Sequence, residues 1–385
     1  MRFEFATATG IRFGTGTAGE IGPAAKEMGN RALFASGLPL ELATPLTSRL
    51  EAAGVACVPF AVVSEPTLDL IQQGVQHARA EQCDLVVGFG GGSAIDAGKA
   101  IAALLTNGGA LMDYLEVIGK GKPLRVPSAP FIAVPTTAGT GAEVTRNAVL
   151  AAPEHQVKVS LRSPLMLARL AVVDPELTLD LPPTITAYTG LDALTQVIEP
   201  YVCNRANPLT DGFCVEGMRR ASRSLRRAYR NGRDVEARTD MSLASLLGGL
   251  ALANAGLGVV HGFAAPLGGM FPAPHGAVCA ALLPCGMEVN IRALRARAPE
   301  SESLRRYEEV ARLLTGKPSA GADDGVQWVR EICQELNIPR LSAYGIRQAD
   351  LPVLVERAAR ASSMKGNPIV LTPEELGEVL AGALW

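Results

Sequence analysis

The first half of the chain alternates short apolar runs with amphipathic stretches. The apolar runs are rich in valine, phenylalanine and isoleucine and lie at 31–36, 55–62, 84–90 and 131–136. Stretches with the apolar spacing of helices lie between them, at 46–54, 68–81 and 94–105. Such alternation is typical of βαβ units, so we predict an α/β N-terminal domain built around a parallel sheet.

The pattern changes near Leu181, where the paired prolines Pro182 and Pro183 interrupt the chain. Beyond them no run has the character of a strand, and long helical patterns dominate. Thr184 or Thr186 suits the N-cap of the first of these helices. We therefore predict two domains, an α/β domain at 1–181 and an all-α C-terminal domain at 182–385, which agrees with the length of the chain.

Composition narrows the possible partners to small molecules. The net charge of −2, from 36 basic and 38 acidic residues, gives no electrostatic footprint for nucleic acid or an anionic membrane. The N-terminal residues lack a secretory signal pattern, and no uninterrupted apolar run is long enough to span a membrane. These features predict a cytoplasmic protein.

The seven cysteines are odd in number, scattered and free of CxxC pairs, which predicts reduced and mostly buried thiols. Cys279, four residues after His275, is the one cysteine whose position suggests a reactive thiol. We favour a core role for it.

A glycine-rich segment follows the apolar run at 84–90. Gly90, Gly91 and Gly92 precede Ser93 and Asp96, which open a helical stretch. Backbone N–H groups without neighbouring side chains approach phosphates closely, and a helix N-terminus favours an anion. Neither GxGxxG nor GxxxxGK[ST] is present, but the order of strand, glycines and helix favours a phosphate-binding loop over a simple tight turn. The sheet is therefore interpreted as nucleotide-binding.

A second polar cluster, at 135–147, follows the apolar run at 131–136. Thr136, Thr137 and Thr140 are expected to line the same nucleotide, because loops at the carboxyl ends of parallel strands bind ligands. The turn after the first long apolar run contains Ser36 and Gly37 and no acidic residue, so nothing there repels a 2′-phosphate. NAD(P)(H) is the predicted cofactor, with NADP(H) slightly favoured.

Two of the four histidines in the chain, His261 and His275, lie within eighteen residues that contain a Gly/Pro-rich break. The first ends an apolar run at 245–260 that is interpreted as a buried helix, and the second follows Pro272 and Pro274. If the turn between them brings the two imidazoles close together, both can bind one metal ion. Asp192, with Gln196 four residues later on the same helical face, supplies the carboxylate that such a site requires.

These segments, in this order, resemble the iron-containing, or group III, alcohol dehydrogenases along nearly the whole chain. The resemblance rests on RFGTGTAGEIG, GGGSAIDAGKA, PTTAGTGAEVT, VVDPELTLDLPP, TGLDALTQVIEPYV and HGFAAPLGGMFPAPHG. It implies NAD(P)(H) bound by the first domain, a divalent metal (Fe or Zn) held in the second, and an active site between them.

The resemblance also implies roles for particular residues. Gly90, Gly91, Gly92 and Ser93 would meet the cofactor pyrophosphate, and Lys158 would lie near the nicotinamide. Asp192, His261 and His275 match three of the four metal ligands of the family and would form the catalytic centre.

The fourth ligand differs. Gln196 stands where the family usually has histidine, Ala265 replaces a histidine close to the substrate, and Ala142 replaces a serine. An amide oxygen is a weaker ligand than imidazole for iron or zinc. The site could therefore bind its metal more loosely, prefer a harder ion, or hold no metal. Without a histidine at 265, bound water, the cofactor ribose and Tyr188 are the available proton donors.

We predict an NAD(P)(H)-dependent oxidoreductase that interconverts a small alcohol and its aldehyde or ketone, and family habit suggests a homodimer. The alternative is a metal-independent reductase of an unsaturated or keto acid, similar to maleylacetate reductase. A third interpretation is a non-redox relative, either a dehydroquinate-synthase-like lyase or a silent binding protein. The DALT and GGMFPAPHG segments favour the dehydrogenase.

Overall fold

The computed structural model describes residues 2–384 and divides into two compact units. One contains Phe5–Thr137 and Gly141–Leu179, and the other contains, within the described residues, 180–384, 2–4 and the short segment Ala138–Thr140. Each unit has a hydrophobic core of its own.

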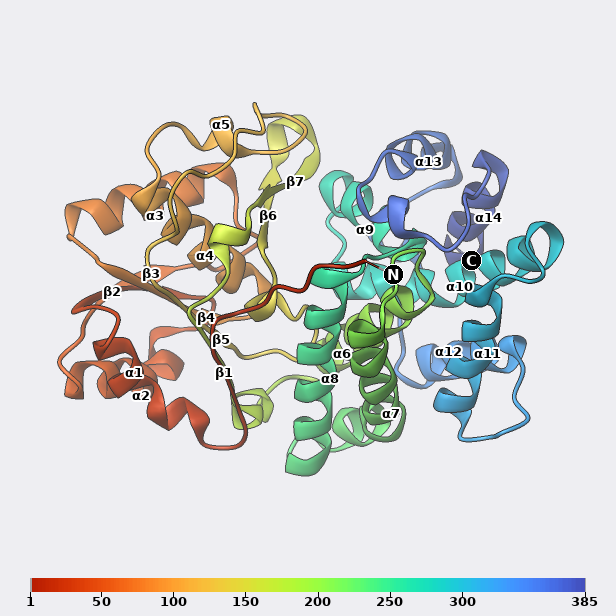
Figure 1. The fold of residues 1–385 in the computed structure, drawn as a ribbon, viewed down its shortest axis with the longest axis horizontal. Helices are drawn as coiled ribbons and strands as arrows, with labels where there is room; N and C mark the ends of the chain where they lie inside the picture. Colours follow the sequence, from red (N-terminus) through yellow and green to blue (C-terminus); the bar gives the residue numbers. More distant parts are fainter. Residues whose placement is uncertain (1, 385) are drawn as a thin grey trace. The chain divides into compact units, whose positions relative to one another are not determined.

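The first unit contains a six-stranded sheet in the order β1-β8-β5-β4-β2-β3, with every pair parallel (Figure 1). Its strands are β1 (Ile11–Phe13), β2 (Arg31–Ser36), β3 (Ala56–Ala61), β4 (Leu85–Gly90), β5 (Phe131–Pro135) and β8 (Leu170–Val173). The predicted α/β domain with a parallel sheet is confirmed. The four predicted apolar runs are β2 to β5, whereas β1 and β8 were not predicted because three or four residues carry little periodicity.

Helices cover both faces of this sheet (Figure 1). They are α1 (Ile21–Lys26), α2 (Leu40–Ala52), α3 (Leu68–Ala80), α4 (Gly92–Thr106) and the short α5 (Leu111–Tyr114). Figure 1 shows α1 and α2 on one face and α3 and α4 on the other. An antiparallel hairpin, β6 (Asn147–Ala152) and β7 (Val157–Arg162), packs against α4.

Strand order reverses beside β2. This strand pairs with β3 on one side and β4 on the other, so that Ala32 lies opposite both Cys57 and Leu85. The connections that leave β2 and β4 therefore run in opposite directions from neighbouring strand ends. Such a switch point is where open α/β sheets bind ligands.

The second unit is helical throughout its described residues, as the sequence predicted. Its α-helices are α6 (Pro183–Val202), α7 (Pro208–Arg230), α8 (Val235–Asn254), α9 (Val259–Met270), α10 (His275–Arg297), α11 (Glu302–Thr315), α12 (Ala322–Glu335), α13 (Leu351–Ala359) and α14 (Pro373–Leu384). The helices α6, α7 and α8 pack along one another, and α10 packs against α6, α9, α12 and α14.

The start of α6 corrects one prediction. The N-cap is Pro182 and the helix begins at Pro183, so neither Thr184 nor Thr186 caps it. Proline suits the first helical position because its fixed φ is already helical and its missing N–H would have had no partner there. The hydroxyl of Thr186 instead accepts a hydrogen bond from the Arg238 guanidinium at 2.8 Å.

A second correction concerns His261. The apolar run at 245–260 is not one helix, because α8 ends at Asn254 and α9 starts at Val259 after a bend of 96°. His261 therefore lies in the first turn of α9 instead of at the end of a long helix. The helix α10 is apolar enough to span a membrane by composition, but 83% of that window is buried inside the protein, which is typical of a core helix.

Candidate metal and cofactor sites

The glycine segment lies at the switch point of the sheet. Gly90 has φ +146°, and a Cβ there would lie 2.8 Å from the Ala94 Cβ and 3.0 Å from the Gly37 amide nitrogen. Gly90 thus serves the close approach of the ends of β2 and β4. A Cβ on Gly91 would meet only Thr137, at 3.5 Å, so the backbone at Gly91 is more open.

Gly91 is the N-cap of α4, and no side chain caps this helix N-terminus. The start of a 15-residue helix, with a glycine at its cap and the positive end of its dipole, fits an anionic ligand such as a pyrophosphate. The structure is therefore compatible with the role predicted for Gly90, Gly91, Gly92 and Ser93.

Other residues predicted for the cofactor lie close to this segment. The Thr136 amide donates to the Gly90 carbonyl oxygen at 2.9 Å, and the Thr137 side chain lies 3.5 Å from the place a Cβ on Gly91 would take. The Ser36 hydroxyl donates to the Leu38 carbonyl oxygen at 2.8 Å, so it belongs to the turn after β2. Thr140 falls in the segment that groups with the helical unit.

Asp96 and Lys99 on α4 hold the polar loop after β5 in place. The fully buried Lys99 ammonium donates to the carbonyl oxygens of Ala142 and Asn147, at 2.8 and 2.7 Å, and to the Thr145 hydroxyl at 3.0 Å. Asp96 lies 3.3 Å from the Lys99 ammonium and accepts from the Val149 amide. Sequence reasoning missed Lys99, although a lysine inside an apolar helical run indicates a buried partner.

Lys158, predicted to lie near the nicotinamide, is on β7 with its side chain 7% exposed and paired with Glu65. Its partner therefore comes from the segment between β3 and α3.

The helical unit brings together the ligands predicted from three separate helices. Asp192 lies in the middle of α6, His261 in the first turn of α9, and His275 at the first residue of α10. The Asp192 Oδ1 atom is 3.4 Å from His261 Nε2 and 3.7 Å from His275 Nε2. A fourth group, the Cys279 thiol one turn further along α10, completes a set whose ligand atoms all lie within 4.8 Å of one another.

Glu199 orients His261, and the sequence reasoning missed it. Its Oε2 atom accepts from His261 Nδ1 at 2.7 Å, and its Oε1 atom accepts from the Val260 amide at 2.7 Å. A carboxylate on Nδ1 fixes the tautomer that presents the Nε2 lone pair to a metal. Glu199 follows Asp192 by seven residues, so its position on the same face of α6 was readable from the sequence.

Gln196 also lies at this site and is 2% exposed. Its Nε2 atom donates to the Gly139 carbonyl oxygen at 3.2 Å, which fixes the orientation of the amide. Among the described residues, Gln196 Oε1 and Asp192 Oδ1 are buried and make no hydrogen bond. Two such oxygens are costly unless a cation or water satisfies them.

The charges of the site favour a cation. Although burial opposes ionisation of Asp192, the neighbouring His275 and His261 hold the pKa of this carboxyl below its ordinary value. Burial likewise opposes protonation of His261, but Cys279, Asp192 and Glu199 raise its pKa well above the ordinary value. The pKa of His275 is raised as well, chiefly by Cys279. The cluster thus attracts positive charge, and protons compete with a metal for it.

Close backbone packing sets the position of His275. A Cβ on Gly276 would lie 2.6 Å from the Tyr188 carbonyl oxygen, so the first turn of α10 lies directly against α6. Asp192 is one helical turn after Tyr188. The Tyr188 hydroxyl, one of the predicted proton donors, accepts from the Tyr344 hydroxyl at 3.4 Å.

The donor set fits a divalent ion. It offers a carboxylate, two imidazoles and a thiol, with two buried oxygens that have no hydrogen bond among the described residues. Imidazole and thiolate are ligands of zinc and iron, and carboxylate is accepted by both. Asp192, His261 and His275 thus form a candidate metal site in the helical unit.

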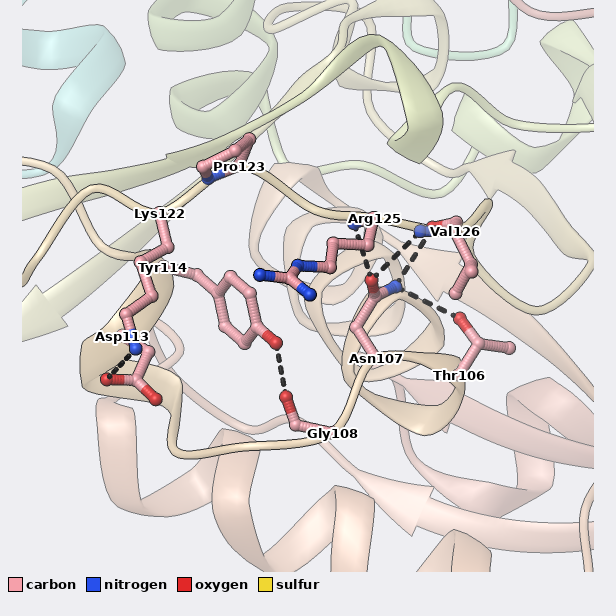
Figure 2. Close-up of a pocket in the computed structure, with 9 residues that line it drawn as sticks. All are labelled: Thr106, Asn107, Gly108, Asp113, Tyr114, Lys122, Pro123, Arg125 and Val126. Atoms are coloured by element: carbon pink, nitrogen blue, oxygen red, sulfur yellow. Dashed lines mark hydrogen bonds and ion pairs between the residues drawn. The ribbon is translucent and has the colours of Figure 1, made fainter.

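A separate hollow in the α/β unit carries none of the predicted cofactor residues. Figure 2 shows it between the end of α4, α5 and the 122–126 segment. The Asn107 amide group bonds the backbone of Arg125 and Val126, and Lys122 pairs with Asp113. These contacts hold the 122–126 segment in place, and we interpret the hollow as a by-product of this loop packing.

Comparisons with known proteins assign the family. The family model for iron-containing alcohol dehydrogenase matches residues 8–175, and the model for the C-terminal part of the Fe-containing alcohol dehydrogenase family matches residues 186–384. The chain therefore belongs to the iron-containing alcohol dehydrogenase family, and it is an alcohol dehydrogenase of that family. Divalent metal and NAD(P) are typical cofactors there.

Relatives and solved structures agree. The chain is 38% identical to alcohol dehydrogenase 4 of Schizosaccharomyces pombe over 84% of this chain and 74% of that protein. It is 35% identical to the 1,3-propanediol dehydrogenase of Klebsiella pneumoniae over 87% of this chain and 85% of that protein. A crystal structure of a 1,3-propanediol oxidoreductase superposes with a TM-score of 0.92 at 32% identity, covering 100% of both chains.

Proposed function

We propose that this protein interconverts a small alcohol and its aldehyde or ketone with NAD(P)(H), at a divalent metal site formed by Asp192, His261, His275 and Gln196. The observation that supports the proposal best is the convergence of three helices on one cluster. In this cluster the Asp192 Oδ1 and Gln196 Oε1 atoms are buried and make no hydrogen bond among the described residues. An alcohol or carbonyl substrate is the class that the family implies.

When bound, the divalent ion supplies a Lewis acid for the substrate oxygen and the nicotinamide supplies the hydride. The chain supplies the framework for both. Glu199 holds the Nε2 atom of His261 toward the site, and burial of Asp192 excludes water from its carboxylate. On the α/β unit, the N-terminus of α4 receives the pyrophosphate, and Lys99 fixes the threonine loop beside it.

Ala265 leaves the metal site without the second imidazole of α9 that the family commonly has. Proton transfer then falls to water, the cofactor ribose or Tyr188. The contact between the Tyr188 and Tyr344 hydroxyls offers a short path for a proton within the helical unit.

We propose that NADP(H) is accepted and slightly preferred. No acidic residue follows β2, where an acid would bond the ribose hydroxyls and repel a 2′-phosphate. Related proteins use NAD, including the NAD-dependent methanol dehydrogenase of Bacillus methanolicus, which is 32% identical to this chain. The kcat/KM values for NADPH and NADH with one aldehyde would decide the matter, and a higher value for NADH would overturn the preference.

A homodimer in the cytoplasm stays a prediction.

The decisive experiment combines metal content with activity. Protein purified without added metal or chelator is analysed by mass spectrometry, and NADPH oxidation with a panel of aldehydes and ketones is followed before and after chelation. Near-stoichiometric iron or zinc, with activity lost on chelation and restored by one ion, is the expected result. Activity that persists without metal would overturn the metal role and point to a metal-independent reductase of an unsaturated or keto acid.

A further inference from the structure

The thiol of Cys279 lies inside the metal cluster. It follows His275 by one helical turn on α10 and is fully buried. Its Sγ atom is 3.6 Å from His275 Nε2 and 3.9 Å from His261 Nε2. No other cysteine among the described residues belongs to such a cluster.

These separations match those of atoms that share one ion. For bond lengths of about 2.1 Å to nitrogen or oxygen and about 2.3 Å to sulfur, a tetrahedral ion spaces two N/O ligands about 3.4 Å apart and an N/S pair about 3.6 Å apart. The observed Asp192 to His261 separation is 3.4 Å, and the His275 to Cys279 separation is 3.6 Å. The Asp192 to His275 and His261 to Cys279 separations, 3.7 and 3.9 Å, are about 0.3 Å longer than these spacings. The side chains therefore already surround a space of suitable size.

Hydrogen bonding alone explains the arrangement less well. The single hydrogen of a thiol can be donated to one imidazole only, yet Sγ lies near the Nε2 atoms of both. Glu199 takes Nδ1 of His261 as its partner, which directs the Nε2 lone pair toward the thiol. Asp192 Oδ1 remains without a hydrogen bond although both imidazoles are near it. A shared cation satisfies all four groups at once.

We propose that Cys279 is a metal ligand in this protein and that its thiolate supplies, beside the weaker amide oxygen of Gln196, the strong donor that an imidazole at position 196 would have provided. The inference rests on the proposed metal site. When the sulfur–metal bond forms, the thiol proton is released to solvent. Because thiolate is a soft ligand, the site should then prefer Zn²⁺ over a hard ion such as Mg²⁺, contrary to what Gln196 alone would suggest.

Cobalt substitution tests the ligand directly in the whole chain. Co²⁺ bound to a thiolate shows an intense near-ultraviolet sulfur-to-metal charge-transfer band, whereas Co²⁺ bound only by oxygen and nitrogen does not. We expect this band in the wild type. We also expect it in Gln196→Ala and in Cys285→Ser, a matched control that removes another thiol of α10 outside the cluster. The band should vanish in Cys279→Ser, and Zn²⁺ binding there should weaken by about tenfold or more.

Two further outcomes separate this inference from the proposed function. If the wild type binds stoichiometric Co²⁺ that depends on Asp192, shown by its loss in Asp192→Asn, but lacks the charge-transfer band, then Cys279 is not a ligand and the metal site stands. If neither Co²⁺ nor Zn²⁺ binds the wild type or Cys279→Ser, both the metal site and the role of Cys279 in it are overturned. Retention of the band in Cys279→Ser would also overturn the assignment, because the thiolate would then come from elsewhere.

Discussion

At the scale of single residues, the proposed metal site contains an amide, Gln196, where the resemblance to the family predicts a histidine. The amide is held by the Gly139 carbonyl oxygen, and its own oxygen is buried without a hydrogen-bond partner among the described residues. An imidazole at this position would offer a stronger donor to the ion while its second nitrogen could still donate to Gly139.

Gln196→His is therefore expected to raise Fe²⁺ and Zn²⁺ affinity by about tenfold. Competition with a chromophoric chelator measures the change, and Gln196→Ala, which removes the buried amide oxygen from the site, is expected to weaken binding. Weaker binding in the histidine variant would show that position 196 does not face the ion.

Glu143 provides a test by pH in the α/β unit. Burial raises the pKa of this carboxyl from 4.5 to about 7. The folded state thus binds the proton more tightly than the unfolded chain. Stability from this group is complete below about pH 4.5 and is lost as the pH rises toward about 7.

Glu143→Gln keeps a neutral group at that position at every pH. The melting temperature of this variant should match that of the wild type near pH 5 and exceed it at pH 8. At pH 8 its free energy of unfolding should be larger by something on the order of 1–3 kcal/mol. Thermal melts across this range measure the difference. A difference that does not vary with pH would show that Glu143 does not titrate as inferred.

At the scale of elements, the cluster depends on where α9 and α10 begin. The α9 N-terminus is capped by Asn367, which accepts from the Val259 amide, and by Glu199, which accepts from the Val260 amide. A Cβ on Gly258 would lie 2.9 Å from an oxygen of each cap, so glycine is required there. The group that orients His261 is thus also the group that fixes the start of its helix.

Gly276→Ala should loosen the site without removing a ligand. The added Cβ would lie 2.6 Å from the Tyr188 carbonyl oxygen, and because this atom belongs to the backbone of α6, α10 must move. We expect about tenfold weaker metal binding and a loss of about 1–3 kcal/mol in stability.

The matched control for this variant is Gly212→Ala on α7, where an added Cβ meets nothing within 4 Å. That substitution should leave metal affinity unchanged and raise stability slightly, because alanine is the better helix former. Metal titration and thermal unfolding of both variants provide the comparison. Equal metal affinity in Gly276→Ala and the wild type would show that this packing does not position His275.

At the scale of the whole molecule, each unit has its own core and its own proposed ligand site. The metal cluster lies in the helical unit, and the glycine segment lies in the α/β unit. A ligand that binds only a folded unit stabilises that unit by mass action, by about 2.7 kcal/mol at one hundred times its dissociation constant.

Calorimetry should therefore show that chelation and cofactor act on different transitions. Removal of the metal is expected to lower the helical transition by about 5 °C or more, and NADP(H) is expected to raise the α/β transition by a similar amount. Asp192→Asn should abolish the first effect and leave the second intact. A single transition that both ligands shift equally would contradict this independence.

Four of the six parallel strands, the helical second half and the family could be predicted from the sequence alone, and the site residues were proposed from it. The spacing of apolar residues and the positions of glycines are local properties of the sequence. The strands β2 to β5 and the N-terminus of α4 could therefore be predicted from neighbouring residues alone. Asp192, His261 and His275 were identified by residue type and by resemblance. Gln196 was predicted by its helical spacing from Asp192.

The surroundings of these residues depend on the tertiary structure. Helical spacing places Glu199 on the same face of α6 as Asp192, but its partner His261 lies 62 residues away along the chain, and Lys99 bonds Ala142 across 43 residues. No local pattern encodes either pairing. The bend between α8 and α9 follows from caps supplied by distant side chains. Cys279 suited a core position by sequence, and it became a ligand candidate only because α6, α9 and α10 place its sulfur beside two imidazoles. Long-range packing makes that arrangement, so it could not be derived from the order of residues alone.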